Sequence, residues 1–358
     1  MPIKFKSKIA CVALLLFGCN FVNAQEGAYS SYSPYSVFGM GDICRQGTVY
    51  NLSMGGTGIA SRNHRFINYL NPAAITARDT LSFMMDFGLV GEGKLYKQGD
   101  VKSASNLLNI SNVAFTVPIY KKSAFVAGIS PYSSMGYDFS HDITDPSLIG
   151  SVGNINYRSY GEGGVYQIFA GGAATFWNKL SVGAQFLYYF GNIDKSTIMN
   201  FSESSYRDVY SGYILNLNAI GGNFGVQYEQ ALPSGLSLTV GATYKTSSKL
   251  KGYVTDYKYA TVSSVTDTLK YKTDTLSHGS NVKLASEYGV GIALKKGDRW
   301  RAEFNYTRSD WRNSNLENVI GFANAGDAKF STTYSQSFRA GFEIVPNPND
   351  IRYYMRRC

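Results

Sequence analysis

The chain has 358 residues, of which only 16% are charged, while 28 are Tyr, 21 are Phe and 37 are Gly. Soluble domains average about 25% charged residues. The net charge of +9 comes from Lys and Arg scattered along the chain, which excludes the clustered basic face of a nucleic-acid-binding protein. No stretch after residue 25 reaches the length of an apolar membrane helix, so the composition favours a β-barrel, the other structure that satisfies all backbone groups in lipid.

Residues 1–24 have the features of a cleavable signal peptide. Three lysines precede an apolar run, and Ala24 completes a Val-x-Ala cleavage pattern. The run is far shorter than the roughly 20 apolar residues of a membrane span, so it cannot anchor the mature chain. An alternative interpretation takes Cys19 as the start of a lipoprotein, although Phe17 is bulky where such sites carry a small residue. After cleavage at Ala24 two cysteines remain, enough for one disulfide at most.

Residues 25–79 show no strand alternation and are too long for an ordinary loop. A Gly-rich run that contains Gly55 and Gly56 leads to Asn71-Pro72-Ala73, shortly before a series of strand-like segments. This order and spacing resemble the N-terminal hatch of the long-chain fatty acid outer-membrane transporter family. The resemblance implies that residues 25–79 plug a fourteen-stranded barrel, and that hydrophobic substrates leave sideways through a kink in the third strand.

From residue 80 onward, apolar side chains recur at every second position, which is the period of a β-strand with one apolar face. In the clearest run, Leu236, Leu238 and Val240 lie on one face, and Ser237 and Thr239 on the other. The fold is therefore predicted to be all-β. We predict ten strands, over 80–90, 111–119, 123–132, 164–176, 180–190, 213–228, 236–246, 284–294, 299–308 and 333–345.

Short and long connections alternate between these strands. Short turns are predicted at 120–122, 177–179, 231–235 and 295–298, and long polar loops at 91–110, 133–163, 191–212, 247–283 and 309–332. Short periplasmic turns and long extracellular loops are typical of outer-membrane barrels, so residues 80–358 are predicted to form a transmembrane antiparallel up-and-down β-barrel. A soluble β-sandwich would share the alternation, but not the aromatic residues at strand ends, such as Trp177 and Trp300.

The third predicted strand contains Pro131. Proline cannot donate a hydrogen bond to a neighbouring strand, so it marks a bulge or a break. By the family resemblance, Pro131 is the candidate kink. The alternative is that Pro131 merely ends the strand at the outer rim.

Inward-facing positions are mixed in character. The candidate lumen residues are Leu187, Tyr189, Gln227, Arg301, Glu303, Arg339 and Glu343. A lumen tolerates charges because water or a plug satisfies them. We expect the four charged residues to pair across adjacent strands and to help to hold the hatch; the alternative is that they are ordinary solvated side chains.

The predicted barrel ends unusually. After the tenth strand, Pro346 and Pro348 make a turn, and a short run from Ile351 stops at Cys358. A barrel normally finishes with a complete strand, because an unpaired edge in lipid leaves backbone groups without partners. We therefore expect a chain that lacks its final strands and a barrel that is not fully closed.

The sequence offers no recognisable catalytic or cofactor-binding motif. It has no His-Glu-x-x-His, no Gly-x-Ser-x-Gly and no Cys-x-x-Cys, and His64 lies in the expected hatch. We therefore expect no enzyme, no metal and no cofactor. The alternative is a protease or phospholipase site at the rim, formed by His141 or His278 with Asp142 or Ser277.

These patterns predict an outer-membrane barrel for passive uptake of hydrophobic compounds such as long-chain fatty acids. Its partners would be outer-membrane lipid and hydrophobic small molecules, without nucleic acid. Burial of apolar ligand surface would drive binding, at about 25 cal/mol per Å². The same scaffold could instead dock secretion or surface-attachment proteins. A continuous apolar tunnel would favour uptake, whereas a polar, plugged lumen with apolar loop patches would favour docking.

Overall fold

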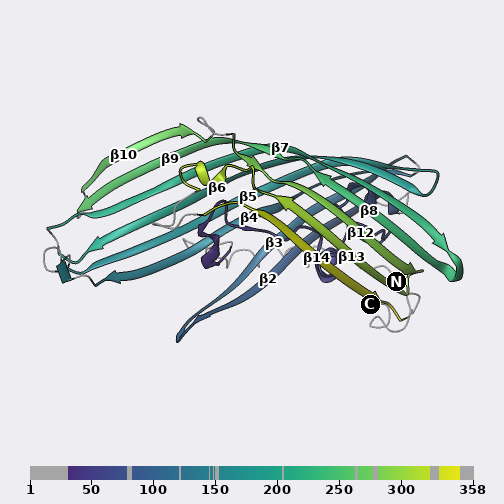
Figure 1. Cartoon of the computed structure of the whole chain (residues 1–358), viewed down its shortest axis with the longest axis horizontal. Coiled ribbons are helices and arrows are strands. Elements are labelled where there is room, and N and C mark those ends of the chain that lie inside the picture. Colours follow the sequence, from purple (N-terminus) through teal and green to yellow (C-terminus); the bar gives the residue numbers. More distant parts are fainter. Residues whose placement is uncertain are drawn as a thin grey trace, which may run out of the picture.

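An antiparallel β-sheet that curls into a half-barrel dominates the computed structural model (Figure 1). The model describes residues 31–78, 83–120, 122–144, 146, 147, 149, 153–203, 205–262, 265–276, 281–322 and 330–346. The expected signal peptide, the C-terminal run from Ile351, and Ser277 and His278 lie outside these residues. None of the helices in the described ranges is long and apolar enough to cross a membrane.

Ten long strands follow one another around the sheet in sequence order, each antiparallel to its neighbours. They are β2 (Met84–Gln98), β3 (Val101–Tyr120), β4 (Ser123–Ile143), β5 (Ile155–Phe176), β6 (Leu180–Phe201), β7 (Asp208–Leu232), β8 (Leu236–Lys245), β12 (Ser286–Lys296), β13 (Trp300–Asp310) and β14 (Tyr334–Ile344). All ten predicted strands are confirmed, and so is the all-β barrel architecture.

The sheet is longer at one end than the sequence predicts. Strands β9 (Ser248–Val262) and β10 (Val265–Thr275) form a hairpin there, and β9 pairs with residues 208–219 of β7 while β8 pairs with residues 223–232. Two short strands, β1 (Asp42–Ile43) and β11 (Lys283–Leu284), pair with β4 and β9. Strands β2 and β14 are the two edges, and within the described residues they do not pair with each other.

The four predicted short turns are confirmed at the opposite end of the sheet. Between β5 and β6 the chain reverses through Trp177 and Asn178, whose φ angles are 46° and 58°. Positive φ angles match the right-handed twist of the paired strands and permit a tight reversal. Ser234, Gly235 and Gly297 have positive φ angles at two of the other turns for the same reason.

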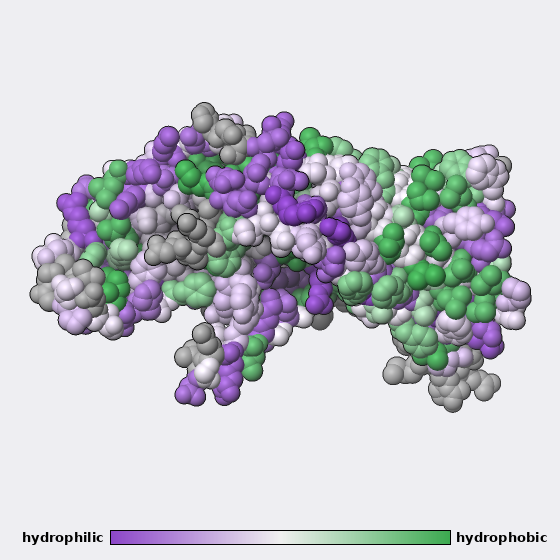
Figure 2. Space-filling model, in the orientation of Figure 1, coloured by the Kyte–Doolittle hydropathy of each residue, from purple (hydrophilic) through white to green (hydrophobic). Residues whose placement is uncertain are grey.

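Four of the predicted long loops are wrong. The described residues of 91–110, 133–163, 191–212 and 247–283 are mostly strand, whereas those of 309–332 lie largely outside the sheet and include the short helix η5 (Leu316–Asn318). These strand extensions carry polar side chains, as Figure 2 shows at the end with β9 and β10. Alternation of apolar and polar residues identifies a strand only where one face meets an apolar environment, so the pattern disappears where both faces meet water.

The apolar stripes lie on the outward face of the half-barrel. Phe186, Val290 and Phe304 are 53%, 54% and 47% exposed, although they occupy the centres of strands. Figure 2 shows hydrophobic side chains gathered over the end of the sheet with the short turns. In the described part of the chain no second sheet covers them, so the β-sandwich alternative is wrong. Exposed aromatic and aliphatic side chains at this position are typical of a lipid-facing barrel wall.

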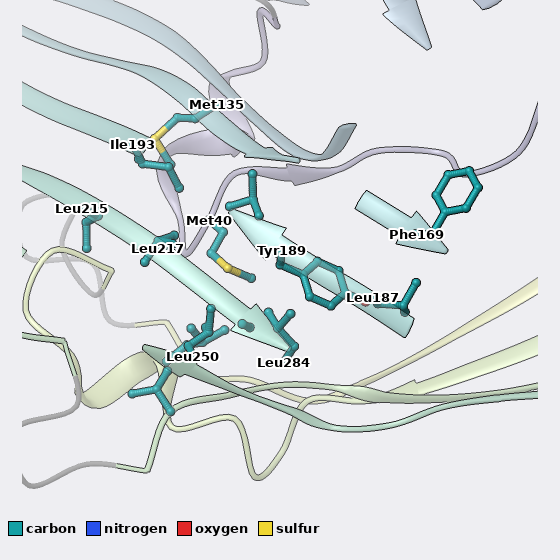
Figure 3. Packing of buried hydrophobic residues seen from close by; sticks show 14 of the residues in the cluster. Met40, Met135, Phe169, Leu187, Tyr189, Ile193, Leu215, Leu217, Leu250 and Leu284 are labelled. Carbon is teal, nitrogen blue, oxygen red and sulfur yellow. The ribbon is translucent and has the colours of Figure 1, made fainter. Parts of the chain in front are cut away.

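Residues 31–78 lie against the inward face of the sheet. They include the short helices η2 (Pro34–Val37), α2 (Val49–Ser53) and η3 (Pro72–Ala77), and η3 contacts β4, β5, β6 and β7. Apolar side chains of this segment and of the strands form one buried cluster, part of which Figure 3 shows. We call residues 31–78 the hatch below.

Candidate functional site in the plugged lumen

The Asn71-Pro72-Ala73 motif organises the hatch internally and also reaches the wall, where the Asn71 amide nitrogen donates to the carbonyl of Val226 at 3.3 Å. Asn71 is fully buried, and its amide nitrogen donates to the carbonyl of Ile59 at 2.7 Å, while its side-chain oxygen accepts from the backbone N–H of Ala73 at 3.0 Å. This second bond caps η3, a role to which Asn is suited. Pro72 begins the helix, where its missing N–H would have had no partner. The local sequence therefore defines both the helix and its attachment to the rest of the hatch.

Inward-facing glycines of the wall form the seat on which the hatch rests. A Cβ atom built on Gly183 would lie 2.6 Å from the carbonyl carbon of Pro72, and one built on Gly225 would lie 2.8 Å from Pro72 Cδ and closer still to Asn71. Gly241 and Gly341 face the carbonyl oxygens of Ile59 and Met54 in the same way. We call these four residues the glycine seat. Only glycine permits this approach of one backbone to another.

Sequence reasoning missed the glycine seat, although a signal was present. Gly183 lies between Val182, an exposed outward residue, and Ala184, so its parity assigns it to the inward face. Gly225 lies in the same way between Phe224 and Val226, which are both exposed. Glycines at inward positions of successive strands indicate a surface that receives another backbone.

In the hatch itself, Gly55 and Gly56 have φ angles of 68° and 79°, in the left-handed region that favours glycine. A Cβ atom on Gly55 would lie 2.5 Å from the carbonyl oxygen of Ala340, and one on Gly56 would lie 3.4 Å from Arg339. The Gly-rich run thus turns sharply against β14. It places the backbone of Gly55 next to the backbone of Ala340, and the backbone of Gly56 next to the side chain of Arg339.

The four charged candidate residues surround this part of the hatch. Arg301 and Glu343 form an ion pair across β13 and β14, with 3.5 Å between Arg301 Nη1 and Glu343 Oε2. The Tyr50 hydroxyl of the hatch donates to Glu343 Oε2 at 2.8 Å and accepts a hydrogen bond from Arg301. The structure therefore places a hatch residue directly between two wall charges.

The other two charged residues also reach the hatch. Glu303 Oε1 accepts from the backbone N–H of Ala60 at 2.9 Å, and Arg339 Nη1 donates to the carbonyl of Gly56 at 3.3 Å. Arg301 and Glu303 are buried, with 6% and 4% of their surface exposed. All four residues therefore contact the hatch, Arg301 and Glu343 through Tyr50 and Glu303 and Arg339 through backbone atoms, and Arg301 and Glu343 also pair across adjacent strands.

Arg62 of the hatch is the centre of a second polar cluster, which sequence reasoning did not identify. Its guanidinium group lies 3.0 Å from Glu229 Oε2, and it donates to Ser181 at 2.8 Å and to Gln227 at 3.1 Å. Gln227 is fully buried and donates to the carbonyl of Ile59 at 2.8 Å. The candidate lumen residue Gln227 thus binds the hatch through both ends of its amide, accepting from Arg62 and donating to Ile59. Arg62 carried no signal, because nothing in its sequence neighbourhood distinguishes it from Arg65.

Beyond the hatch contacts, the inward face becomes apolar towards the strand extensions. Leu187 and Tyr189 of β6 are 3% and 4% exposed, and they continue into Ile193 on the same strand and Leu215 and Leu217 on β7 (Figure 3). Further members of this lining come from β9, from β11 and the residue before it, and from the segment near η5. They are Leu250, Val282, Leu284, Leu316 and Phe322. Together with apolar residues of the hatch they form one packed, buried cluster that extends from the polar extensions to the hatch, and we call its wall residues the apolar lining.

Lys195 is the buried charged exception in this lining. Its ammonium group donates to the carbonyl of Val37 at 2.9 Å and to that of Phe322 at 3.5 Å. It thereby joins the end of η2 to the segment after η5. A buried ammonium group needs such partners to compensate for the loss of water.

Pro131 lies within β4, because the strand continues to Ile143, so the interpretation that it ends the strand is wrong. Pro131 pairs with Tyr166 and Ser133 with Val165, which leaves Tyr132 as an extra residue in a bulge. A proline at a bulge loses no ladder hydrogen bond. The hatch contacts this bulge, since Gln46 Nε2 donates to the Pro131 carbonyl at 2.7 Å and the Cys44 N–H to that of Tyr132 at 2.9 Å.

His141 and Asp142, which were considered for a catalytic site at the rim, do not come together. His141 and Asp142 are successive residues of β4, so their side chains project from opposite faces of the sheet. Asp142 accepts from Asn156 at 2.8 Å, and the His141 ring lies 5.1 Å from that of Tyr157. Among the described residues, no group of three or more His, Cys, Asp or Glu side chains is arranged to hold a metal ion.

Solved structures of a channel and a transporter are similar to this structure. The CymD monoaromatic hydrocarbon channel is 14% identical, with a TM-score of 0.52 over 87% of this chain and 80% of that chain. The toluene transporter TbuX of Ralstonia pickettii is 17% identical, with a TM-score of 0.52 over 84% of this chain and 82% of that chain. The chain therefore shares the fold of a hydrocarbon channel and of a toluene transporter, as the resemblance implied for the barrel.

The sequence itself identifies the family. The chain belongs to the BamG family, whose model matches residues 6–358. Curated proteins show no significant sequence match to the chain.

Proposed function

We propose that this protein resides in the outer membrane and takes up hydrophobic small molecules by passive diffusion, without enzymatic activity. The observation that carries this proposal is the apolar lining of the inward face, which runs from the strand extensions to the hatch. Leu187, Ile193, Leu215 and Leu217 each have 3% of their surface exposed or less. A ligand that replaced hatch or loop contacts along this lining would gain about 25 cal/mol per Å² of buried apolar surface.

The finer proposal concerns the ligand class and its exit. Two structures of similar fold are described as a monoaromatic hydrocarbon channel and a toluene transporter, and the hatch motif resembles that of fatty acid transporters. We infer that the ligand is a compact hydrocarbon or an acyl chain. The bulge at Pro131 and Tyr132 interrupts the β4–β5 ladder beside the hatch, so it is the proposed position of a lateral exit.

Photoaffinity labelling of the detergent-purified, full-length protein tests the proposal. A diazirine-bearing fatty acid is the probe, and toluene and unlabelled palmitate are the competitors. We expect labelling of Leu187 and Tyr189, which both competitors reduce. The neighbouring outward residues Phe186 and Tyr188 report the surrounding detergent or lipid, because they are 53% and 37% exposed. Labelling confined to these two outward residues would contradict the proposal.

A second candidate function, docking of secretion or surface proteins, rests on a different observation. The hairpin of β2 and β3 projects from the sheet (Figure 1), and it carries exposed apolar residues, with Leu95 71% and Leu108 73% exposed. Apolar side chains on a projecting hairpin indicate a contact surface. A photocrosslinking amino acid at Leu108 would yield a discrete protein adduct in intact cells if this hairpin docks a partner. The same amino acid at Phe186, on the lipid-facing wall, is the control; equal adducts at both positions would exclude a specific docking site.

A further inference from the structure

A pocket of about 280 Å³ lies on the outward face of the strand extensions, away from the lumen and the hatch. Its position follows from the register, because Ser196 of β6 is opposite Tyr160 of β5 and Gly212 of β7, which in turn is opposite Tyr257 of β9. Ser196 has the same parity along β6 as Tyr188, an outward residue of the wall. The pocket therefore opens on the face of the sheet that continues the lipid-facing surface.

The distance from the apolar band follows from the strand geometry. Phe190 is the last residue of the apolar outward stripe on β6, and Ser196 follows six positions later along the same strand. Six residues of a strand span about 20 Å, which corresponds to about 15 Å of height when the strand is tilted by roughly 40°. At that height the outward face of an outer-membrane barrel meets the headgroup layer and not the acyl chains.

The lining of the pocket is rich in hydroxyl groups and contains no charged side chain. It consists of Tyr160, Ser196, Thr197, Ile198, Tyr210, Ser211, Tyr257, Tyr259, Thr261 and Thr266. The tyrosines combine flat apolar faces with a polar tip, and each hydroxyl group both donates and accepts. An apolar ligand would exclude water from this lining without replacing the hydrogen bonds that water makes there, which is unfavourable. A pyranose ring suits this lining, since it has an apolar C–H face for a tyrosine ring and a rim of hydroxyl groups.

Part of the lining is preorganised. Ser196 Oγ donates to Asp194 Oδ1 at 2.7 Å and lies 2.5 Å from the Tyr257 hydroxyl, and the Tyr257 and Tyr259 rings are stacked with 5.5 Å between centroids. Gly212 makes room for this arrangement, because a Cβ atom there would lie 2.7 Å from the Tyr257 hydroxyl. The two rings are thus held in place before a ligand arrives, which reduces the entropy lost on binding.

We propose that this pocket binds a saccharide. The proposal rests on the outer-membrane location given above but not on uptake, since the pocket does not open to the lumen. The saccharide could belong to a glycolipid of the outer leaflet or to a free surface polysaccharide, and these two sources present the same chemistry. The pocket would then fix the strand extensions relative to the cell surface.

Binding measurements with the purified full-length protein test the proposal. The probes are lipopolysaccharide, its core oligosaccharide released by mild acid, and phosphatidylethanolamine as a lipid without sugar, measured by calorimetry in detergent. We expect the core oligosaccharide and lipopolysaccharide to bind, and Tyr259→Ala and Tyr210→Ala each to weaken binding by about tenfold. Tyr257→Phe keeps the ring but loses the bond to Ser196, and a smaller loss is expected. Tyr253→Ala is the matched control, because this exposed tyrosine lies on the same face of β9 outside the pocket.

The outcomes separate the two sources and the competing explanations. Much tighter binding of lipopolysaccharide than of free oligosaccharide assigns the site to a membrane glycolipid, and equal affinities assign it to a free saccharide. Three results would overturn the proposal: binding of neither saccharide probe, equal binding by the pocket variants and the wild type, or binding of phosphatidylethanolamine that depends on the same tyrosines. Photolabelling of Leu187 in the lumen is expected to be unchanged in the Tyr259→Ala variant, so failure of this proposal is distinguishable from failure of the uptake proposal.

Discussion

Adding a single methyl group to the glycine seat is expected to loosen the hatch. In Gly183→Ala the new Cβ atom would lie 2.6, 2.7 and 2.8 Å from three backbone atoms of Pro72 and Ala73. Ordinary contacts of a Cβ atom begin near 3.4 Å, so η3 or β6 must move by about 0.8 Å (3.4 − 2.6). Neither partner is the end of a flexible side chain. The strain cannot be relieved by a rotamer change.

Overpacking of a filled interior costs about 1–3 kcal/mol. If the sheet remains folded, this cost falls on the closed position of the hatch, and the population of the open hatch rises by about 5- to 150-fold. Gly225→Ala acts on Asn71 and Pro72, which belong to the same short segment, so the two substitutions are expected to be less than additive.

Hydrogen exchange followed by mass spectrometry measures this opening, because protection of backbone amides reports the population of open states. Peptides that cover residues 57–78 are expected to lose protection by 5- to 150-fold in Gly183→Ala, while peptides from β12 and β13 remain unchanged. Gly172→Ala is the control, since its Cβ atom would lie 3.6 Å from the nearest atom, the carbonyl oxygen of Ala124. Unchanged protection in Gly183→Ala, or an equal loss in Gly172→Ala, would refute the reasoning.

Three further predictions concern single hatch residues. Arg62→Ala is expected to destabilise the hatch by about 1–3 kcal/mol, because it removes a buried network, whereas Arg65→Ala removes an exposed pair and is expected to change stability by less than about 0.5 kcal/mol. The same exchange experiment compares the two, and equal effects would contradict the assignment. Asn71→Ala is expected to cost about 0.5–2 kcal/mol through loss of the η3 cap, measured as a lower denaturant midpoint for protection of residues 71–78. Burial and neighbouring carboxylates raise the pKa of the Cys44 thiol from 9.0 to about 11, so at pH 8 maleimide should label it about 100-fold more slowly than an exposed cysteine. Its labelling rate should rise about tenfold for each pH unit up to the raised pKa, and rapid labelling at pH 7 would contradict a closed hatch.

Strands that face lipid were predictable from sequence because their environment differs on the two faces. Phe186 and Val290 are exposed to an apolar medium and alternate with inward residues of another kind, so period-two alternation follows directly. The strand extensions gave no such signal. Ser140 and Arg158 pair across β4 and β5 in a polar environment, and their sequence is indistinguishable from a loop. The positions of four of the five expected loops were wrong for this reason.

The candidate site could be predicted from the sequence only in part. Parity assigns Leu187, Gln227 and Arg301 to the inward face, and a motif points to Asn71. The partner of each residue depends on how the hatch folds back over strands more than a hundred positions away, as in the bond from Gln227 to Ile59. Local patterns do not contain this information.

The sequence by itself determined that the strands after about residue 80 form a wall with one apolar outward side, because an apolar medium on one face and the hatch with its polar contacts on the other impose a period of two on the side chains. Only the tertiary structure decided which segments pack against that wall. The contacts of Gly183 with Pro72, the placement of Tyr50 between Arg301 and Glu343, and the tyrosine pocket on the strand extensions all join segments that are remote in sequence. Their geometry depends on the curvature and register of the whole sheet, which no single stretch of residues encodes.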